Sequence, residues 1–241
     1  GELMLKNIEL RDYQKQILND LKYVPAIGLF IKTGGGKTIT SLARFEQNPT
    51  KNLLVICPQK VITQWWEELE KHTDLKPLKY KLNMSAKNKD TLFNDYLKYQ
   101  DVTPNCIVLN FDILDKITCL DKYIDNNWTI IIDESHKIKN MGSYKHPVKI
   151  TKRCLELGEK TLYKIILTAT PTEKENGGYI DLYSQLKFLG YIDYNETFFK
   201  NNFCIMDKFQ VVGMPFPIKK IVGYRMDRIN EQLKPILNAT C

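Results

Sequence analysis

The sequence predicts an α/β protein built on an open, mostly parallel sheet. Its apolar runs are continuous rather than alternating, as in strands covered on both faces, and lie at residues 26–31, 53–57, 106–109, 129–132 and 164–167. Between most of these runs, apolar residues recur at helical spacing at residues 10–21, 38–45, 61–72 and 91–99. Alternating strands and helices favour an open α/β sheet flanked by helices, which binds ligands at the carboxyl ends of its strands.

The pattern changes after residue 170. Helical spacing, a strand pair and a last helix follow in turn at residues 179–189, 196–203, 205–224 and 226–237. We therefore expect an α/β core over residues 1–175. A small helical and β-hairpin extension of the same lobe is expected over residues 176–241.

Length and composition are those of an ordinary folded protein. The 241 residues are 43% hydrophobic and 26% charged, which excludes a disordered or collagen-like chain. No apolar run approaches the roughly 20 residues of a membrane helix, and the N-terminus has no secretion signal. The six cysteines form no C-x-x-C pair, so we expect reduced thiols and an intracellular location.

The charge points only weakly to a polyanionic partner. The formal charge is +7 and the pI is about 8.9, but the basic excess is spread along the chain. Only five of the 35 basic residues are arginine. That bias is typical of an AT-rich genome and favours a virus, a phage or a low-GC bacterium as the source.

A glycine-rich segment, residues 32–38, reads Lys-Thr-Gly-Gly-Gly-Lys-Thr between a predicted strand and a predicted helix. Three glycines let successive backbone N–H groups point at a phosphate, and the helix N-terminus adds partial positive charge. Lys37 would reach the β- and γ-phosphates, and Thr38 would offer its hydroxyl to Mg²⁺. Ile31 lies where the usual phosphate loop has its first glycine. The alternative is a glycine-rich turn that binds nothing.

Two adjacent carboxylates, Asp133 and Glu134, directly follow the apolar run at 129–132. Adjacent acids at the end of a buried strand are costly unless a cation or a proton transfer uses them. Asp133 would hold Mg²⁺ through water, and Glu134 would orient or deprotonate an attacking water. The alternative is a helix cap formed by Asp133 or Ser135. Together with the phosphate loop, the acid pair predicts an ATP-hydrolysis site that uses ATP and Mg²⁺.

Further motifs follow one another along nearly the whole chain, at residues 10–14, 33–38, 56–58, 64–67, 133–140, 167–171, 182–189 and 198–204. Residues 10–14 read Leu-Arg-Asp-Tyr-Gln, residues 133–136 read Asp-Glu-Ser-His, and residues 167–171 read Leu-Thr-Ala-Thr-Pro. In this order the motifs resemble the first RecA-like lobe of superfamily II helicases and translocases. The chain is most similar to the Swi/Snf-type double-stranded-DNA translocases.

The resemblance implies a RecA-like P-loop NTPase lobe and a role for each matching residue. Gln14 would recognise adenine, and the nucleotide-binding residues would be Arg11, Gln14, Thr33, Gly34, Gly35, Gly36, Lys37 and Thr38. The catalytic residues would be Lys37, Asp133 and Glu134, with Thr38 and Asp133 holding Mg²⁺. Coupling between nucleotide state and DNA would fall to His136, Thr168 and Thr170. The DNA backbone would contact Pro58, Gln59, Lys60 and Asn110.

Some conspicuous side chains have structural interpretations. We expect Trp65 and Trp66 to be core residues, because aromatic residues on an amphipathic helix seldom serve as base-stacking platforms. His72 and His146 have no partner pattern and are expected at the surface.

The chain also departs from the family pattern after Pro171. Residues 172–178 are longer and more charged than the usual segment there, which puts its coupling role in question. Arg225 and Arg228 suggest the arginine motif of a second lobe, but they follow Thr170 by only about 50 residues, too few for another domain. We expect them to belong to an exposed helix start, with the second RecA-like lobe absent from this chain.

The favoured function is therefore the ATP-binding lobe of a DNA-dependent ATPase that moves along duplex DNA when joined to a second lobe. One alternative is a strand-separating RNA or DNA helicase, or the motor of a restriction system. A duplex-splitting pin would favour a helicase, and no segment visibly encodes one. Another alternative is a non-catalytic module that binds nucleic acid or protein, but a damaged phosphate loop or acid pair would be expected there.

Overall fold

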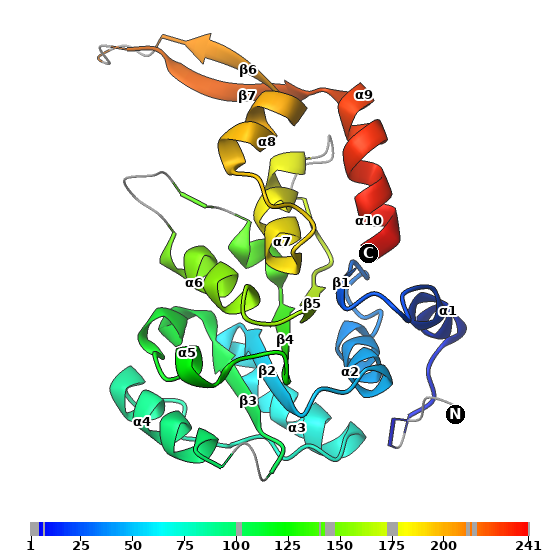
Figure 1. The fold of residues 1–241 in the computed structure, drawn as a ribbon, viewed down its shortest axis with the longest axis vertical. Coiled ribbons are helices and arrows are strands. Elements are labelled where there is room, and N and C mark those ends of the chain that lie inside the picture. Colours follow the sequence, from blue (N-terminus) through cyan, green and yellow to red (C-terminus); the bar gives the residue numbers. More distant parts are fainter. Residues whose placement is uncertain are drawn as a thin grey trace.

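A five-stranded parallel sheet, in the order β1-β5-β4-β2-β3, forms the centre of the molecule (Figure 1). The computed structural model describes residues 5, 6, 8–99, 103–139, 141–142, 148–172, 178–210, 213 and 216–240. The strands are β1 (Ala26–Leu29), β2 (Asn52–Cys57), β3 (Cys106–Asn110), β4 (Trp128–Asp133) and β5 (Tyr163–Leu167). All of the apolar runs predicted as strands are confirmed, and nearly every strand residue is buried.

Helices flank the sheet on both sides, with α1 and α2 on the right and α4, α5 and α6 on the left in Figure 1. The helices of this part are α1 (Asp12–Asp20), α2 (Lys37–Gln47), α3 (Ile62–His72), α4 (Ala86–Leu97), α5 (Leu120–Tyr123) and α6 (Lys149–Gly158). Short 3-10 helices are η1 (Gln59–Val61), η2 (Phe111–Lys116), η3 (Ser135–Ile138) and η4 (Tyr179–Asp181). The predicted helices are confirmed, whereas α5 and α6 were not predicted. Helix α4 begins before the predicted residue 91, because the Ser85 side chain caps it by accepting a hydrogen bond from the Asn88 N–H.

Besides η4, the C-terminal extension consists of α7 (Leu182–Leu189), α8 (Glu196–Phe203), β6 (Cys204–Phe209), β7 (Ile218–Tyr224), α9 (Met226–Arg228), the π-helix η5 (Ile229–Leu233) and α10 (Lys234–Thr240). Strands β6 and β7 form an antiparallel hairpin that projects from one end of the molecule (Figure 1). This order confirms the helices and the strand pair predicted after residue 170. The predicted division at residues 175 and 176 falls outside the described residues and stays a prediction.

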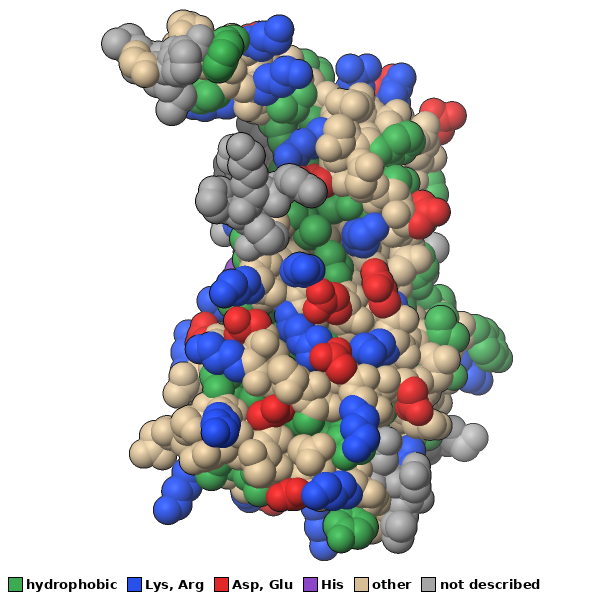
Figure 2. Space-filling view, turned by 60° about the vertical axis from the view of Figure 1, so that its left-hand side comes forward, with side chains coloured by type: hydrophobic (Ala, Val, Ile, Leu, Met, Phe, Trp, Pro, Cys, Tyr) green, Lys and Arg blue, Asp and Glu red, His purple; other side chains and the backbone are tan. Residues whose placement is uncertain are grey.

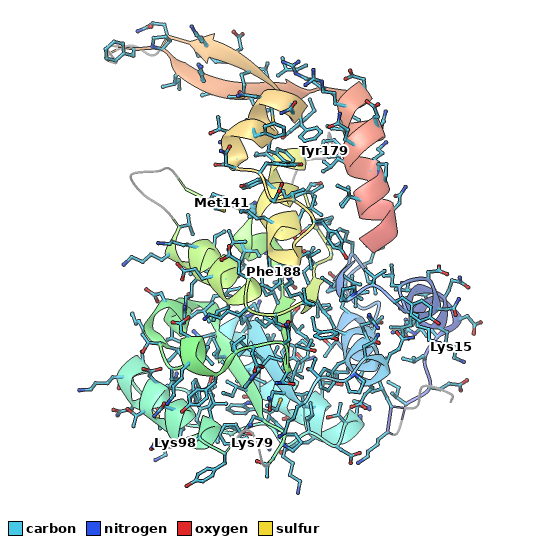
Figure 3. The ribbon with its side chains drawn as sticks, in the orientation of Figure 1. Lys15, Lys79, Lys98, Met141, Tyr179 and Phe188 are labelled. Carbon is cyan, nitrogen blue, oxygen red and sulfur yellow. The ribbon has the colours of Figure 1, made fainter. Side chains whose placement is uncertain are left out.

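Two apolar clusters form the core, and α7 contributes to both. The larger cluster contains the sheet and its flanking helices, together with Phe188 and Leu189 of α7. The smaller one joins α7, α8 and η5 through residues such as Tyr183, Phe199 and Leu233. Figure 3 shows Phe188 at the junction between α7 and α6. A Cβ on Gly158 of α6 would lie 2.7 Å from the Phe188 ring, so this close packing requires glycine.

The structure confirms one expectation about side chains and corrects another. Trp65 and Trp66 are core residues, with 2% and 7% of their surface exposed. His72 is also buried, at 3% exposed, contrary to the surface position expected. It ends the buried face of α3, and its Nδ1 lies 2.8 Å from the Lys6 carbonyl oxygen while its Nε2 lies 3.3 Å from a Glu68 carboxylate oxygen. His146 lies outside the described residues.

The remaining global features agree with the composition. In the part of the chain that the structure describes, no helix is long and apolar enough to cross a membrane. The cysteines described there are all buried and free of disulfides. On the face shown in Figure 2, basic and acidic side chains are interspersed over the lower part of the molecule, as the even spread of charge along the chain predicts.

Candidate ATP and nucleic-acid site

The predicted site residues that follow strands lie at one edge of the sheet, because all five strands run parallel. Along this edge, β1 leads into the phosphate loop (residues 32–38), β5 into Thr168, and β4 into the acid pair (Asp133 and Glu134). Strands β2 and β3 lead into Pro58 and Asn110. Neighbouring strands lie about 4.8 Å apart. The sheet order therefore places the acid pair between the phosphate loop and the residues predicted to contact DNA.

The phosphate loop curls through two glycines with positive φ. Gly34 and Gly36 both have a φ of 78°, a region that glycine adopts without steric cost. A Cβ on Gly35 would collide with the Ile31 side chain and lie 2.9 Å from the Lys32 carbonyl oxygen. Ile31, which replaces the usual first glycine, and the Lys32 carbonyl together leave room only for glycine at position 35.

The functional side chains of this loop remain accessible to a ligand. Thr33 and Gly34 are exposed, and Lys37 and Thr38 are half-buried in the first turn of α2. A phosphate at this helix N-terminus would meet backbone N–H groups and the Lys37 amine together. The loop is therefore open to a phosphate, and its binding role stays a prediction.

Helix α1 supports the phosphate loop through Gln14, which is 4% exposed. Its Nε2 donates to the Thr40 hydroxyl at 2.7 Å and to the Gly36 carbonyl at 3.3 Å, while its Oε1 accepts from the Arg11 N–H at 2.9 Å. The neighbouring Tyr13 hydroxyl donates to the Gly35 carbonyl. The Gln14 amide is thus engaged within the chain, and its role in adenine recognition stays a prediction.

The acid pair lies at a sharp turn after β4. Glu134 has φ 56° and ψ 54° and is the one non-glycine residue with positive φ among the described residues. This left-handed conformation costs about 1–2 kcal/mol for a residue with a Cβ. Such strain in a strand-end acid supports a functional role for Glu134, because a structural turn here would favour glycine.

The Asp133 carboxylate is held by two hydrogen bonds. The Glu134 backbone N–H donates to Oδ1 at 2.9 Å, and the Trp65 indole Nε1 donates to Oδ2 at 2.9 Å. Burial raises the pKa of Asp133, as does the charge of Glu134, while these two hydrogen bonds and the charge of Lys37 oppose the rise. A cation at this carboxylate would therefore offset the cost of its burial.

The three predicted coupling residues come together beside Glu134. His136 Nδ1 lies 3.2 Å from a Glu134 carboxylate oxygen and 3.4 Å from the Thr168 hydroxyl. The Thr168 hydroxyl, which belongs to a fully buried residue, also accepts a hydrogen bond from the Thr170 N–H at 3.1 Å. A movement of the Glu134 carboxylate would therefore be transmitted to the loop after β5 through the His136 imidazole.

A cavity of about 540 Å³ opens beside the acid pair. It is lined by Pro58, Gln59, Lys60, Val61, Phe111, Asp112, Asp133, Glu134, His136 and Lys137. The predicted DNA-contacting residues 58–60 thus share a cavity with the acid pair. Asn110 is 3% exposed, and its Nδ2 donates to Asp112 at 3.3 Å, so Asp112 and not Asn110 lines the cavity. The DNA contact of Asn110 stays a prediction.

Comparison with known proteins agrees with this geometry. Residues 26–237 match the SNF2-related domain. The chain belongs to this family. The RecA-like fold of this SNF2-related domain agrees with the parallel sheet.

Individual relatives support the same assignment. A SWI/SNF-related matrix-associated actin-dependent regulator of chromatin from Rattus norvegicus is 28% identical over 202 residues, which cover 78% of the chain and 18% of the relative. The DNA repair protein RAD5 of Yarrowia lipolytica is 27% identical over 216 residues, 80% of the chain and 19% of the relative. This SNF2-related domain therefore spans about a fifth of these relatives' length. The predicted virus, phage or low-GC source is not tested by them.

A solved structure is similar as well. The Sulfolobus solfataricus SWI2/SNF2 ATPase core has a TM-score of 0.66 and 27% identity, covering 84% of this chain and 40% of that one. The similarity confirms the RecA-like lobe predicted from the order of the motifs.

Sequence reasoning missed the role of Gln185 in this SNF2-related domain. Gln185, on α7, is fully buried; its Oε1 accepts from the Ser135 hydroxyl at 2.7 Å, and its Nε2 donates to the carbonyls of Pro171 and Asp181 at 3.0 and 2.9 Å. Ser184 beside it donates to the Ile138 carbonyl. Two adjacent polar residues, Ser184 and Gln185, in the largely apolar segment 182–189 were the available signal.

The residues predicted to hold Mg²⁺ fit that ion. Among the described residues, no three His, Cys, Asp or Glu side chains are grouped to cage a metal. Mg²⁺ is usually bound by one or two carboxylates together with phosphate oxygens and water, rather than by an all-protein cage. One hydroxyl from Thr38 and one half-buried carboxylate from Asp133 match that donor set.

Proposed function

We propose that this SNF2-related domain is the ATP-binding first lobe of a motor that moves along double-stranded DNA. The carrying observation is a phosphate loop and an acid pair at one sheet edge, with the acid pair sharing a cavity with residues 58–60. The similar Sulfolobus solfataricus ATPase core was solved in complex with double-stranded DNA, which supports the choice of partner. An intact Lys37 and Glu134 disfavour a purely binding module.

In the proposed reaction, each residue acts on a group close to it. The loop N–H groups and Lys37 would bind the β- and γ-phosphates and neutralise their charge. Mg²⁺, held by Thr38 and Asp133, would supply further charge neutralisation at the phosphates. Glu134 would orient the attacking water and accept its proton, and His136, 3.2 Å away, would relay the change to Thr168.

The site is proposed to be completed by an arginine from a second RecA-like lobe. Such an arginine typically contributes a factor of about 10³ to 10⁵ in rate. Arg44 donates to the Lys22 and Val24 carbonyls, Arg153 pairs with Asp121, and Arg228 donates to Asn202. Arg225 is exposed at the start of α9, as the sequence predicts. We therefore expect the 241-residue chain alone to hydrolyse ATP poorly.

Duplex DNA is proposed to bind over residues 58–60 through its phosphates, without reading the sequence. Gln59 and Lys60 are exposed, and Lys60 carries the positive charge that a phosphate requires. The basic excess of the chain agrees with such a partner. DNA as partner also implies that the protein acts inside a cell.

A strand-separating helicase is the second candidate, favoured by one observation. The β6–β7 hairpin projects from the molecule (Figure 1). Phe216, which lies between the two strands in sequence, is 78% exposed. An exposed aromatic on a projecting hairpin has the form of a wedge between base pairs. Displacement of one strand from a duplex would therefore favour this candidate over plain translocation.

The test is the ATPase rate of the full-length protein without nucleic acid and with duplex DNA, single-stranded DNA or RNA. We expect stimulation by duplex DNA and a fall of about 10² to 10⁴ in the stimulated rate for Glu134→Gln, because the proton acceptor is removed. ATP binding by Glu134→Gln should persist. Stimulation by RNA or single strands but not by duplex would refute the translocase, and strand displacement in the same preparations would support the helicase.

A further inference from the structure

Trp65 connects α3 to the acid pair although it is a core residue. Its side chain is 2% exposed, and its indole N–H donates to Asp133 Oδ2 at 2.9 Å. A buried indole N–H usually has an acceptor, and the backbone carbonyls inside α3 are already used by the helix. Here the acceptor is the carboxylate that is predicted to hold Mg²⁺.

This hydrogen bond restricts the orientation of the carboxylate. Oδ1 accepts from the Glu134 N–H of the same turn, whereas Oδ2 accepts from Trp65, which is 68 positions away along the chain. Two donors on different oxygens fix the plane of the carboxyl group. Each carboxylate oxygen has two acceptor positions, so one on each oxygen stays available for a water bound to Mg²⁺.

The position of Trp65 along α3 gives the contact a second consequence. Helix α3 begins at Ile62, directly after η1 (Gln59–Val61), so Trp65 lies in its first turn. The residues of η1 line the same cavity as Asp133. A shift of η1 against a ligand would therefore move the indole that holds Oδ2, because a helical turn moves as a rigid unit.

We infer that Trp65 is a positioning residue: its indole N–H orients the Asp133 carboxylate for Mg²⁺ and links that carboxylate to the DNA-contacting residues 58–60. The inference rests on the proposed function, which supplies the nucleotide and the DNA. It assigns to the tryptophan a role beyond packing. Deleting the N–H should therefore weaken Mg²⁺ use while leaving the phosphate loop intact.

The neighbouring Trp66 provides a matched control within the same helix. Trp66 is 7% exposed and packs edge-to-face on Tyr80, with ring centroids 5.3 Å apart. Among the described residues, its buried indole nitrogen has no hydrogen-bond partner. Trp65→Phe and Trp66→Phe therefore remove the same atoms from adjacent buried positions, and only the first removes a bonded N–H.

The first measurement is the Mg²⁺ dependence of binding of a fluorescent, non-hydrolysable ATP analogue to the full-length protein without DNA. In Trp65→Phe, the half-saturating Mg²⁺ concentration should rise about 10- to 100-fold, the usual effect of losing a partner of a metal-binding group. Binding without Mg²⁺ should be unchanged, and Trp66→Phe should match the wild type in both. An equal Mg²⁺ dependence in the two variants would overturn the inference.

The second measurement compares basal and duplex-stimulated ATPase rates. Trp65→Phe should reduce the stimulation factor by about fivefold or more, a typical coupling between sites, whereas Trp66→Phe should preserve it. An equal loss of both rates would overturn the link to residues 58–60. If duplex DNA fails to stimulate the wild type, the proposed function fails instead, and the DNA-free Mg²⁺ titration still decides the positioning role.

An isosteric replacement distinguishes the loss of the Trp65 hydrogen bond from a folding defect. If Trp65→Phe unfolds, as a thermal melt would show, Trp65 is replaced by β-(3-benzothienyl)alanine, in which sulfur takes the place of the N–H. This side chain fills the same volume and cannot donate the hydrogen bond. The same Mg²⁺ shift is expected, and wild-type Mg²⁺ dependence in this protein would refute the positioning role.

Discussion

The two loops of the ATP site are each supported by a buried glutamine from a helix outside the sheet, but the two supports differ in what they join. Gln14 of α1 bonds to Gly36, Thr40 and the start of its own helix, all close to the phosphate loop. Gln185 of α7 joins Ser135, which follows β4, to Pro171, which follows β5. The first support is therefore local, whereas the second connects two separate loops.

The two loops also differ in the residue that adopts the left-handed conformation. The phosphate loop uses Gly34 and Gly36 for its positive φ angles, so its curvature costs little. The acid loop places Glu134 there, and the strain must be offset by surrounding contacts such as those of Gln185. A strained loop that is tied to its neighbour is suited to moving with it, while an unstrained loop is suited to holding a ligand still.

The largest effect is expected when Gln14 and Gln185, the two supporting glutamines, are each replaced by alanine. Gln185→Ala leaves the buried Ser135 hydroxyl and the Pro171 carbonyl without partners, and should lower the free energy of unfolding by about 3 kcal/mol. Gln14→Ala should lower it by about 1–2 kcal/mol, because water can reach the half-exposed Gly36. Chemical unfolding of the 241-residue chain measures both. Equal losses would mean that Gln185 is no more than a local support.

At the opposite edge of the sheet, one buried polar side chain is expected to destabilise the fold. Lys164 of β5 is 6% exposed and donates to the Gly158 carbonyl at 3.0 Å. Burial lowers its pKa to about 8, with the charge of Glu159 opposing the change. Folding therefore disfavours its proton, and the penalty is complete below pH 8 and disappears as pH rises from about 8 to 10.5.

Lys164→Met should accordingly stabilise the chain at pH 7, by about 1–3 kcal/mol. The gain should shrink as pH rises above 8, because the wild-type amine then loses its proton in the folded state. Unfolding curves at pH 7 and pH 10 measure the two values. A gain that does not depend on pH would show that packing, and not the charge of Lys164, limits stability here.

The smallest expected effect concerns the strain in the acid loop. Glu134→Gly should raise the free energy of unfolding by about 1 kcal/mol, since glycine accepts a φ of 56° without steric cost, while ATP hydrolysis is lost. Glu134→Ala is the matched control, because it removes the carboxylate and keeps the Cβ. If both variants have the same thermal stability, the left-handed turn is not strained.

Most of the architecture was predictable because it depends on local patterns. Continuous apolar runs mark strands buried on both faces, and each of them forms a strand of the sheet. Helices α5 and α6 were not predicted: α5 has only four residues, and α6 follows a segment without a visible start signal. His72 was misplaced because a single polar residue does not reveal that the segment around Lys6 covers it.

The site was predictable only in part. The phosphate loop and acid pair are contiguous motifs, so their residue types and spacing indicate their chemistry directly. Gln185 and Trp65 reach the acid loop from positions 50 and 68 residues away in sequence. No local pattern marks such partners, because their meeting depends on how α7 and α3 pack against the end of β4.

The sequence by itself therefore determined the α/β alternation and the residues of the phosphate loop and acid pair, since each depends on neighbours along the chain. The order β1-β5-β4-β2-β3 was decided only in the tertiary structure, and it sets the acid pair between the nucleotide loop and residues 58–60. The supports by Gln14, Gln185 and Trp65 were decided there as well. Burial makes those hydrogen bonds strong, and burial is a property of the packed whole rather than of any segment.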